Sequence, residues 1–157
     1  MMVDLCVVNA GESPAPLGLG LHPLFVRRGA ERIRFTAAGA WRNGLDMLRS
    51  APIDGGLWNH SEGQPVGAQE LDNDFFGWEG AACIESGQAL PIRITASAIF
   101  SILRVFTPPG QDFFAIEPVS HLTDAINGAC APGAGMFIAE PGAQLAGSVW
   151  IGADSVS

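Results

Sequence analysis

Glycine and proline interrupt this chain about every ten residues, and this spacing limits the length of any secondary-structure element. Of 157 residues, 20 are glycine and 11 are proline. The segments between them are short and rich in valine, isoleucine, phenylalanine and threonine, which favour strands. No window of about eleven residues or more has a convincing helical period. Many short strands without intervening helices predict an all-β fold, an antiparallel β-sandwich, rather than a parallel α/β sheet.

Eight segments have the pattern of strands. Alternation is clearest in RIRF and PIRIT, where Ile33 and Phe35, and likewise Ile92 and Ile94, would face the core. The segments IFSILRVF and DFFAIEPV are apolar at adjacent positions, which indicates central strands covered on both faces. The stretch NGLDMLRS after Trp41 could form a turn or two of helix. The predicted strands are 3–9, 32–38, 80–86, 91–96, 99–107, 112–119, 136–140 and 144–152.

Length and composition predict one domain over residues 1–157, with a packed core. The formal net charge of −8 disfavours nucleic acid and anionic membrane surfaces as partners, because both are themselves negative. The N-terminal segment has no basic region, and no apolar stretch reaches about 18 residues. We therefore expect neither a signal peptide nor a transmembrane helix, and a cytoplasmic location.

The sequence offers no recognisable metal or nucleotide motif. Cys6, Cys83 and Cys130 are widely spaced, which predicts neither a disulfide framework nor a zinc cluster. None of the three histidines has a partner at the short spacings of zinc ligands, so we expect no metal ion. A nucleophile elbow, a phosphate-binding loop and a dinucleotide fingerprint are also absent.

The first segment that could carry chemistry is PLGLGLHPLF. Pro23 favours an extended conformation at His22, which would hold the imidazole at a strand end or turn. Histidine exchanges protons near neutral pH, so His22 is a candidate acid or base. The alternative is a structural histidine-proline turn.

The second segment, QELDNDFFGWEG, combines carboxylates and an amide with aromatic rings. Carboxylates such as Asp72 can accept hydrogen bonds from sugar hydroxyls, and an aromatic face such as that of Trp78 suits the C–H face of a pyranose. The alternative is an acidic surface turn that leads into a strand with aromatic core residues.

The third segment is DFFAIEPVSHLTDAIN, in which Glu117 ends an otherwise apolar strand. A desolvated carboxylate has a raised pKa and becomes a better base if it points into a cleft. His121 and Asp124 follow in a loop that could line the same cleft. The alternative is a strand-end glutamate turned to solvent.

In this order, and with a final EPGAQ segment, these motifs resemble the aldose 1-epimerase (galactose mutarotase) family. The resemblance implies a galactose mutarotase-like β-sandwich, truncated here, because the motifs correspond to the C-terminal half of a family member. It implies that His22 is the general acid, that Glu117 is the general base and that Asp72 holds sugar hydroxyls. No family role is carried over to Trp78, which is a candidate from its residue type alone.

The activity implied is that of an isomerase, which interconverts the α and β anomers of a free hexose such as galactose or glucose. No cofactor is needed, because the reaction is proton transfer alone. The missing half supplies substrate-binding residues in the family, so the resemblance implies weak activity or none from this chain alone. We would then expect self-association to cover the exposed strand edges, unless the chain is a shortened version of a longer product.

Two alternatives remain open from the sequence. The first is a non-catalytic carbohydrate-binding or interaction domain of the same fold, which would not need His22 and Glu117 to face each other. The second is a relative that acts on phosphorylated hexoses, with Arg27 and Arg28 as the adjacent basic pair.

Overall fold

The computed structural model describes residues 1–43, 49–54, 60–87, 89–127 and 135–153, and these residues form strands, turns and bends. The strands form two six-stranded sheets and one two-stranded sheet, and every pairing is antiparallel. No helix within the described ranges is long and apolar enough to cross a membrane. The predicted all-β fold is confirmed.

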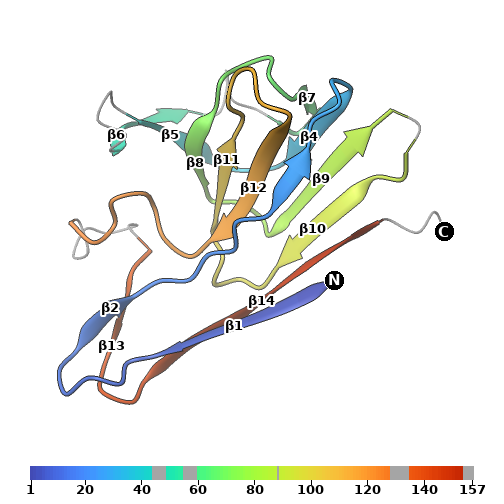
Figure 1. Cartoon of the computed structure of the whole chain (residues 1–157). Coiled ribbons are helices and arrows are strands. Elements are labelled where there is room, and N and C mark those ends of the chain that lie inside the picture. Colours follow the sequence, from blue (N-terminus) through green and yellow to red (C-terminus); the bar gives the residue numbers. More distant parts are fainter. Residues whose placement is uncertain (44–48, 55–59, 88, 128–134, 154–157) are drawn as a thin grey trace.

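The first sheet has the order β1-β14-β10-β9-β4-β7, and the second has the order β3-β12-β11-β8-β5-β6 (Figure 1). Strands β2 and β13 pair with each other. The strands are β1 Met2–Val8, β2 Ala15–Leu17, β3 Leu24–Val26, β4 Glu31–Phe35, β5 Gly39–Asn43, β6 Arg49–Asp54, β7 Gln64–Pro65, β8 Asp72–Phe76, β9 Ala81–Ser86, β10 Ile92–Ala96, β11 Ile102–Phe106, β12 Phe113–Val119, β13 Phe137–Ala139 and β14 Gln144–Ala153.

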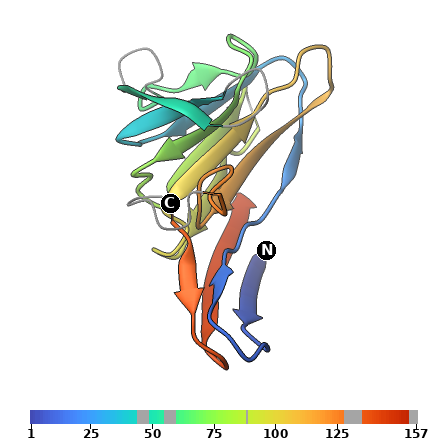
Figure 2. The same cartoon turned by 90° about the vertical axis from the view of Figure 1, so that its left-hand side faces the viewer.

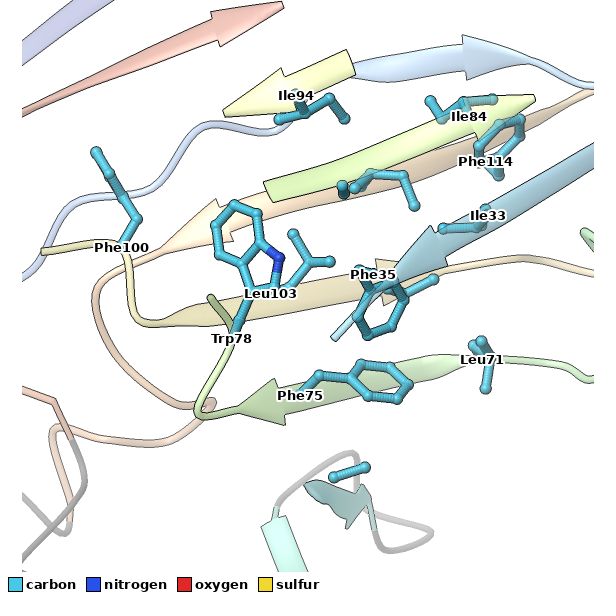
Figure 3. Packing of buried hydrophobic residues seen from close by; sticks show 14 of the residues in the cluster. Ile33, Phe35, Leu71, Phe75, Trp78, Ile84, Ile94, Phe100, Leu103 and Phe114 are labelled. Carbon is cyan, nitrogen blue, oxygen red and sulfur yellow. The ribbon is translucent and has the colours of Figure 1, made fainter. Parts of the chain in front are cut away.

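The core lies between the two large sheets and is built from inward positions of strands in both sheets (Figure 3). In β4, buried and exposed residues alternate, with Ile33 and Phe35 inside, as the alternation in the sequence predicts. Strands β11 and β12 are buried at most positions and lie inside the second sheet, as their apolar runs predict. Apolar burial between the sheets is the main force that holds them together.

All eight predicted strands are present, and their ends differ from the prediction by at most three residues. Six others, β2, β3, β5, β6, β7 and β8, were not predicted. The most important of these is β8, because aspartate and asparagine are depleted in strands and made this segment resemble a turn. Residues 44–48 of the suggested helix lie outside the described residues, and its flanks belong to strands β5 and β6.

Strands β1, β14, β2 and β13 extend beyond the sandwich as an arm (Figures 1 and 2). No residue of β1 is fully buried. Large apolar side chains are exposed on the arm and also at β3, which is an edge strand of the second sheet. They are Met1, Met2, Val8, Phe137 and Ile138 on the arm, and Leu24 and Val26 in β3. The structure thus has the exposed edges and apolar surface that half of a larger sandwich would leave.

Candidate active site

His22 and Glu117 are neighbours because the chain before β3 continues the register of that strand along β12. The pairing of β3 with β12 begins at Leu24, and an isolated bridge joins Gly20 to Val119. The residue midway between these pairings is His22, and it lies opposite Glu117. Its Nε2 is 3.2 Å from Oε1 of Glu117. The two side chains therefore lie on the same face of the sheet.

The Glu117 carboxylate is almost completely buried, with 7% of the side chain exposed, whereas the His22 side chain is 61% exposed. Oε1 of Glu117 has no hydrogen-bond partner among the described residues, so its contact with His22 does not have hydrogen-bond geometry. Burial raises the pKa of Glu117, and the nearby His22 and Arg104 offset this effect only in part. A carboxylate with a raised pKa is a stronger base than an ordinary glutamate.

A row of charged residues crosses the second sheet on the face turned away from the first sheet. Arg104 in β11 lies opposite Glu117 in β12 on one side and opposite Asp74 in β8 on the other. The residues on either side of Arg104 in β11 point into the core, so Arg104 points outward. We call His22, Glu117, Arg104 and Asp74 the charged row.

Arg104 holds two carboxylates of β8. Its Nη1 donates a hydrogen bond of 3.0 Å to Oδ1 of Asp74, and its Nη2 pairs with Oδ1 of Asp72. The Asp74 side chain is only 1% exposed, whereas 24% of the Asp72 side chain is exposed. Asp72 is therefore the carboxylate of this pair that a ligand can reach.

The segment after β12 lies beside the charged row and is held by Arg104 and Asp74. Oδ2 of Asp74 accepts a hydrogen bond of 2.5 Å from the Thr123 backbone N–H, and Nη1 of Arg104 donates to Oγ1 of Thr123. These three residues, with His121 and Asp124, help to line a pocket of about 300 Å³, the lower end of the range for small-molecule sites. His121 and Asp124 thus lie beside the charged row.

His121 packs closely over the glycine-rich segment before His22. A Cβ atom at Gly18 would lie 2.4 Å from Nδ1 of His121, so this approach requires glycine at position 18. Burial lowers the pKa of His121, although the nearby Asp74 opposes this effect. A histidine with a lowered pKa is neutral at pH 7.

Trp78 is not part of the site, which corrects the prediction that its ring offers a stacking face. Its side chain is 5% exposed within the core between the sheets, and its Nε1 donates a hydrogen bond of 2.8 Å to the Ala81 carbonyl (Figure 3). The tight turn at Gly77, which has a positive φ of 64°, directs the chain so that Trp78 packs inward. A ring buried in this way cannot cover a pyranose.

The Arg27 side chain binds two loops and is not directed toward the charged row. Its guanidinium donates to the carbonyl oxygens of Pro108 at 3.3 Å and of Val66 at 3.4 Å. A substituent on Gly67 would collide with the Arg27 guanidinium, which shows how closely that loop covers it. Nothing in this geometry favours binding of a phosphorylated hexose by Arg27.

Sequence reasoning did not identify Arg104 or Thr123 as site residues, and it weighed Asp74 only as part of an acidic cluster. A signal was present for Arg104, because it is the one charged residue in the apolar segment IFSILRVF. A charge in a strand that is otherwise buried needs a partner of opposite sign. The sequence could not show that this partner comes from β8, since that pairing joins residues 30 positions apart.

The arrangement is suited to proton transfer. An exposed imidazole and a buried carboxylate with a raised pKa share one face, and the partly exposed Asp72 carboxylate lies on β8, two strands from β12. Within the described part of the chain, no group of three or more His, Cys, Asp or Glu side chains could hold a metal ion.

Comparison with known proteins gives one sequence relative and several solved structures. No family model matches the chain. The uncharacterized protein YphB of Escherichia coli K12 is 31% identical over 137 residues, which cover 79% of this chain and 46% of that protein. The chain thus spans about half the length of this relative.

The solved structures share the fold. A candidate aldose 1-epimerase of Escherichia coli K12 has a TM-score of 0.84 and 27% identity, with 96% of this chain and 54% of that chain covered. A galactose mutarotase-like protein of Clostridium acetobutylicum has a TM-score of 0.81 and 17% identity, with 98% and 52% covered. A homologue of aldose epimerase from C. elegans has a TM-score of 0.76 and 14% identity, with 98% and 56% covered. The resemblance stated from the motifs is therefore confirmed over about half of these chains.

Proposed function

We propose that this chain, which has the galactose mutarotase-like fold over about half the length of its relatives, binds a hexose over the charged row and interconverts its anomers. The observation that carries this proposal is the Glu117 carboxylate, which is buried, has an unpartnered Oε1 and faces an exposed imidazole. A buried acceptor without a partner costs folding free energy, and a ligand hydroxyl would satisfy it.

In the proposed reaction, Glu117 takes the proton from the C1 hydroxyl while His22 donates a proton to the ring oxygen. The bond between C1 and the ring oxygen breaks, and the open-chain aldehyde forms. Rotation about the C1–C2 bond followed by closure gives the other anomer. A positioned acid or base typically contributes about 10²–10⁴-fold to the rate. Asp72 would accept hydrogen bonds from the sugar hydroxyls.

The distance between His22 and Glu117 implies movement on binding. A pyranose between an acid and a base needs about 5–8 Å, by analogy with the carboxylate pairs of glycosidases. The observed contact of 3.2 Å is too short for this. His22 precedes β3 and is exposed, so its side chain can rotate outward, whereas Glu117 is fixed in a central strand. We expect the sugar to enter between them.

The chain's length bears on how active it can be. Because it spans about half the length of its relatives, the proposed site contains only residues of the matching half, and we expect the chain by itself to accelerate mutarotation only weakly. We also propose that a second copy covers the exposed apolar edge at Leu24 and Val26, which are 58% and 63% exposed.

The decisive experiment follows the mutarotation of freshly dissolved α-D-glucose and α-D-galactose by polarimetry. Purified wild type is compared with His22→Ala, Glu117→Gln and the surface control Arg34→Gln. Acceleration over the buffer rate that is lost in the first two variants and retained in the control would support the proposal. Folded wild-type protein that does not accelerate the reaction would contradict it.

The alternative is a non-catalytic carbohydrate-binding domain, favoured by the partly exposed Asp72 beside the charged row. Saturation-transfer NMR with the same two sugars distinguishes a mutarotase from a non-catalytic binding domain. Binding without acceleration, lost in Asp72→Ala but not in His22→Ala, would favour the binding domain.

A further inference from the structure

A second cluster of reactive side chains lies on the outer face of the first sheet, away from the charged row. In register, Cys83 of β9 lies between Arg34 of β4 and Arg93 of β10. The neighbours of Cys83 in its own strand, Ala82 and Ile84, belong to the core, so the thiol points outward. It is half-buried, and both arginines are exposed.

The three residues share a hollow of about 320 Å³, which is also lined by Thr36, Ser61 and Glu79. The hollow exists because a short residue stands between two long ones. Its far side is flanked by a flat aromatic surface, since the Trp150 ring lies over Gly152, the residue opposite Arg93 in β14. A Cβ atom on Gly152 would lie 2.5 Å from that ring.

The charged residues that line the hollow are Arg34, Arg93 and Glu79. The formal net charge is −8, yet Arg34 and Arg93 stand on either side of one thiol. Arg34 contacts Glu85 at 3.1 Å, but the two side chains are 53% and 39% exposed. Exposed pairs of this kind are weak and exchange readily for the carboxylate of a ligand.

We propose that Cys83 is a site of thiol–disulfide exchange with small disulfides that carry carboxylates, glutathione disulfide being one of this class. Arg34 and Arg93 bind the carboxylates and bring the disulfide to the thiol. The Cys83 sulfur, after losing its proton to solvent, attacks one sulfur of the reagent, and the S–S bond of the reagent breaks. The departing thiolate takes up a proton, and Cys83 is left in a mixed disulfide.

The chain contains its own control in Cys6. This thiol is exposed on β1, an edge strand of the same sheet, and Asp4 is the charged residue on the same face of that strand. If exposure alone decided reactivity, Cys6 would react faster than Cys83 with every disulfide. A preference for anionic reagents at Cys83, relative to Cys6, would therefore show the effect of the two arginines.

The test compares two chromogenic disulfides, the anionic dithiobis(nitrobenzoate) and the neutral dithiodipyridine. Rates are measured for the full chain carrying Cys83 alone (Cys6→Ser, Cys130→Ser) and Cys6 alone (Cys83→Ser, Cys130→Ser). We expect the ratio of anionic to neutral rates to be roughly tenfold higher at Cys83, and to fall with added salt. Arg34→Gln and Arg93→Gln should each lower this ratio at Cys83. Arg28→Gln should leave the ratio unchanged, because Arg28 does not line the hollow.

Incubation with glutathione disulfide, followed by mass spectrometry of peptides, should place the adduct on Cys83 in preference to Cys6. The proposal is overturned if the two thiols show the same ratio, if the arginine variants leave the ratio unchanged, or if Cys83 does not react. These readouts do not depend on mutarotation, so they stand or fall separately from the proposed function.

Discussion

At the scale of single residues, Glu117 combines burial with an unsatisfied oxygen in the middle of a sheet. Ordinary folding would place an apolar residue there, as it does at Ile116 on the opposite face. The carboxylate costs stability because its charged form has lost water without gaining a full set of hydrogen bonds. A cost of this kind is expected where a side chain serves a ligand rather than the fold.

The first prediction concerns Glu117→Gln and pH. Burial raises the pKa of Glu117, so the folded state binds this proton more tightly than the unfolded state. The resulting stabilisation is complete below the ordinary glutamate pKa and is lost as pH rises through the raised value. Glu117→Gln should therefore have a higher free energy of unfolding than wild type at pH 7, by about 1–3 kcal/mol, because the glutamine side chain has no charge to be desolvated.

This advantage should disappear below a pH of about 4, where glutamate is protonated in both states. Urea unfolding at both pH values, with the surface variant Glu85→Gln as control, measures the difference. A variant that is equally or less stable than wild type at pH 7 would contradict the role of desolvation.

The second prediction separates a core tryptophan from a sugar-stacking one. Trp78→Ala removes a large side chain from the core and should destabilise the fold by about 3–5 kcal/mol. Trp78→Phe keeps most of the packing and loses the hydrogen bond to Ala81, at a cost of about 1 kcal/mol. Chemical denaturation measures both. If Trp78→Phe abolished sugar binding without changing stability, the core assignment would be wrong.

At the scale of elements, Arg104 joins β8, β11 and the segment after β12. A central strand thus carries a charge whose partners belong to two other elements. One guanidinium thus connects the segment after β12, which lines the pocket, with the charged row. Rigid support of this kind positions a site more precisely than a loop can by itself.

The third prediction tests this connection. Arg104→Gln leaves Asp74 buried without its cation and should cost about 3–5 kcal/mol. The matched control is Arg34→Gln, which breaks an exposed pair worth about 0–1 kcal/mol. Thermal unfolding of the two variants gives the comparison. Equal losses would show that Arg104 is no more important than a surface arginine.

At the scale of the whole molecule, the exposed apolar edge at β3 bears on the state of the isolated chain. The fourth prediction is that wild-type protein associates at micromolar concentration and that Leu24→Lys with Val26→Lys shifts it toward monomer. Charges on an edge strand oppose pairing with another chain. Light scattering coupled to gel filtration measures the mass, with Leu90→Lys as an exposed apolar control outside this edge. A monomeric wild type would overturn the self-association proposal.

Local patterns allowed much of the fold to be predicted. Alternation with a period of two is a property of neighbouring residues, so β4 and β10 could be located, and Ile33, Phe35 and Ile94 could be assigned to the core. Strand β8 could not, because its aspartates and asparagine have no intrinsic preference for a strand and are held there by pairing with β11 and β5.

The sequence by itself determined the all-β architecture and singled out His22 and Glu117, each of which precedes a proline, whereas Asp72 was singled out by its residue type and by the family resemblance of its motif. Their chemical roles stay a prediction. Only the tertiary structure decided that His22 lies opposite Glu117, that Arg104 holds Asp72 and Asp74, and that Trp78 points inward. The physical reason is that strand register joins residues far apart in the chain, and a shift of one residue would turn each side chain to the opposite face.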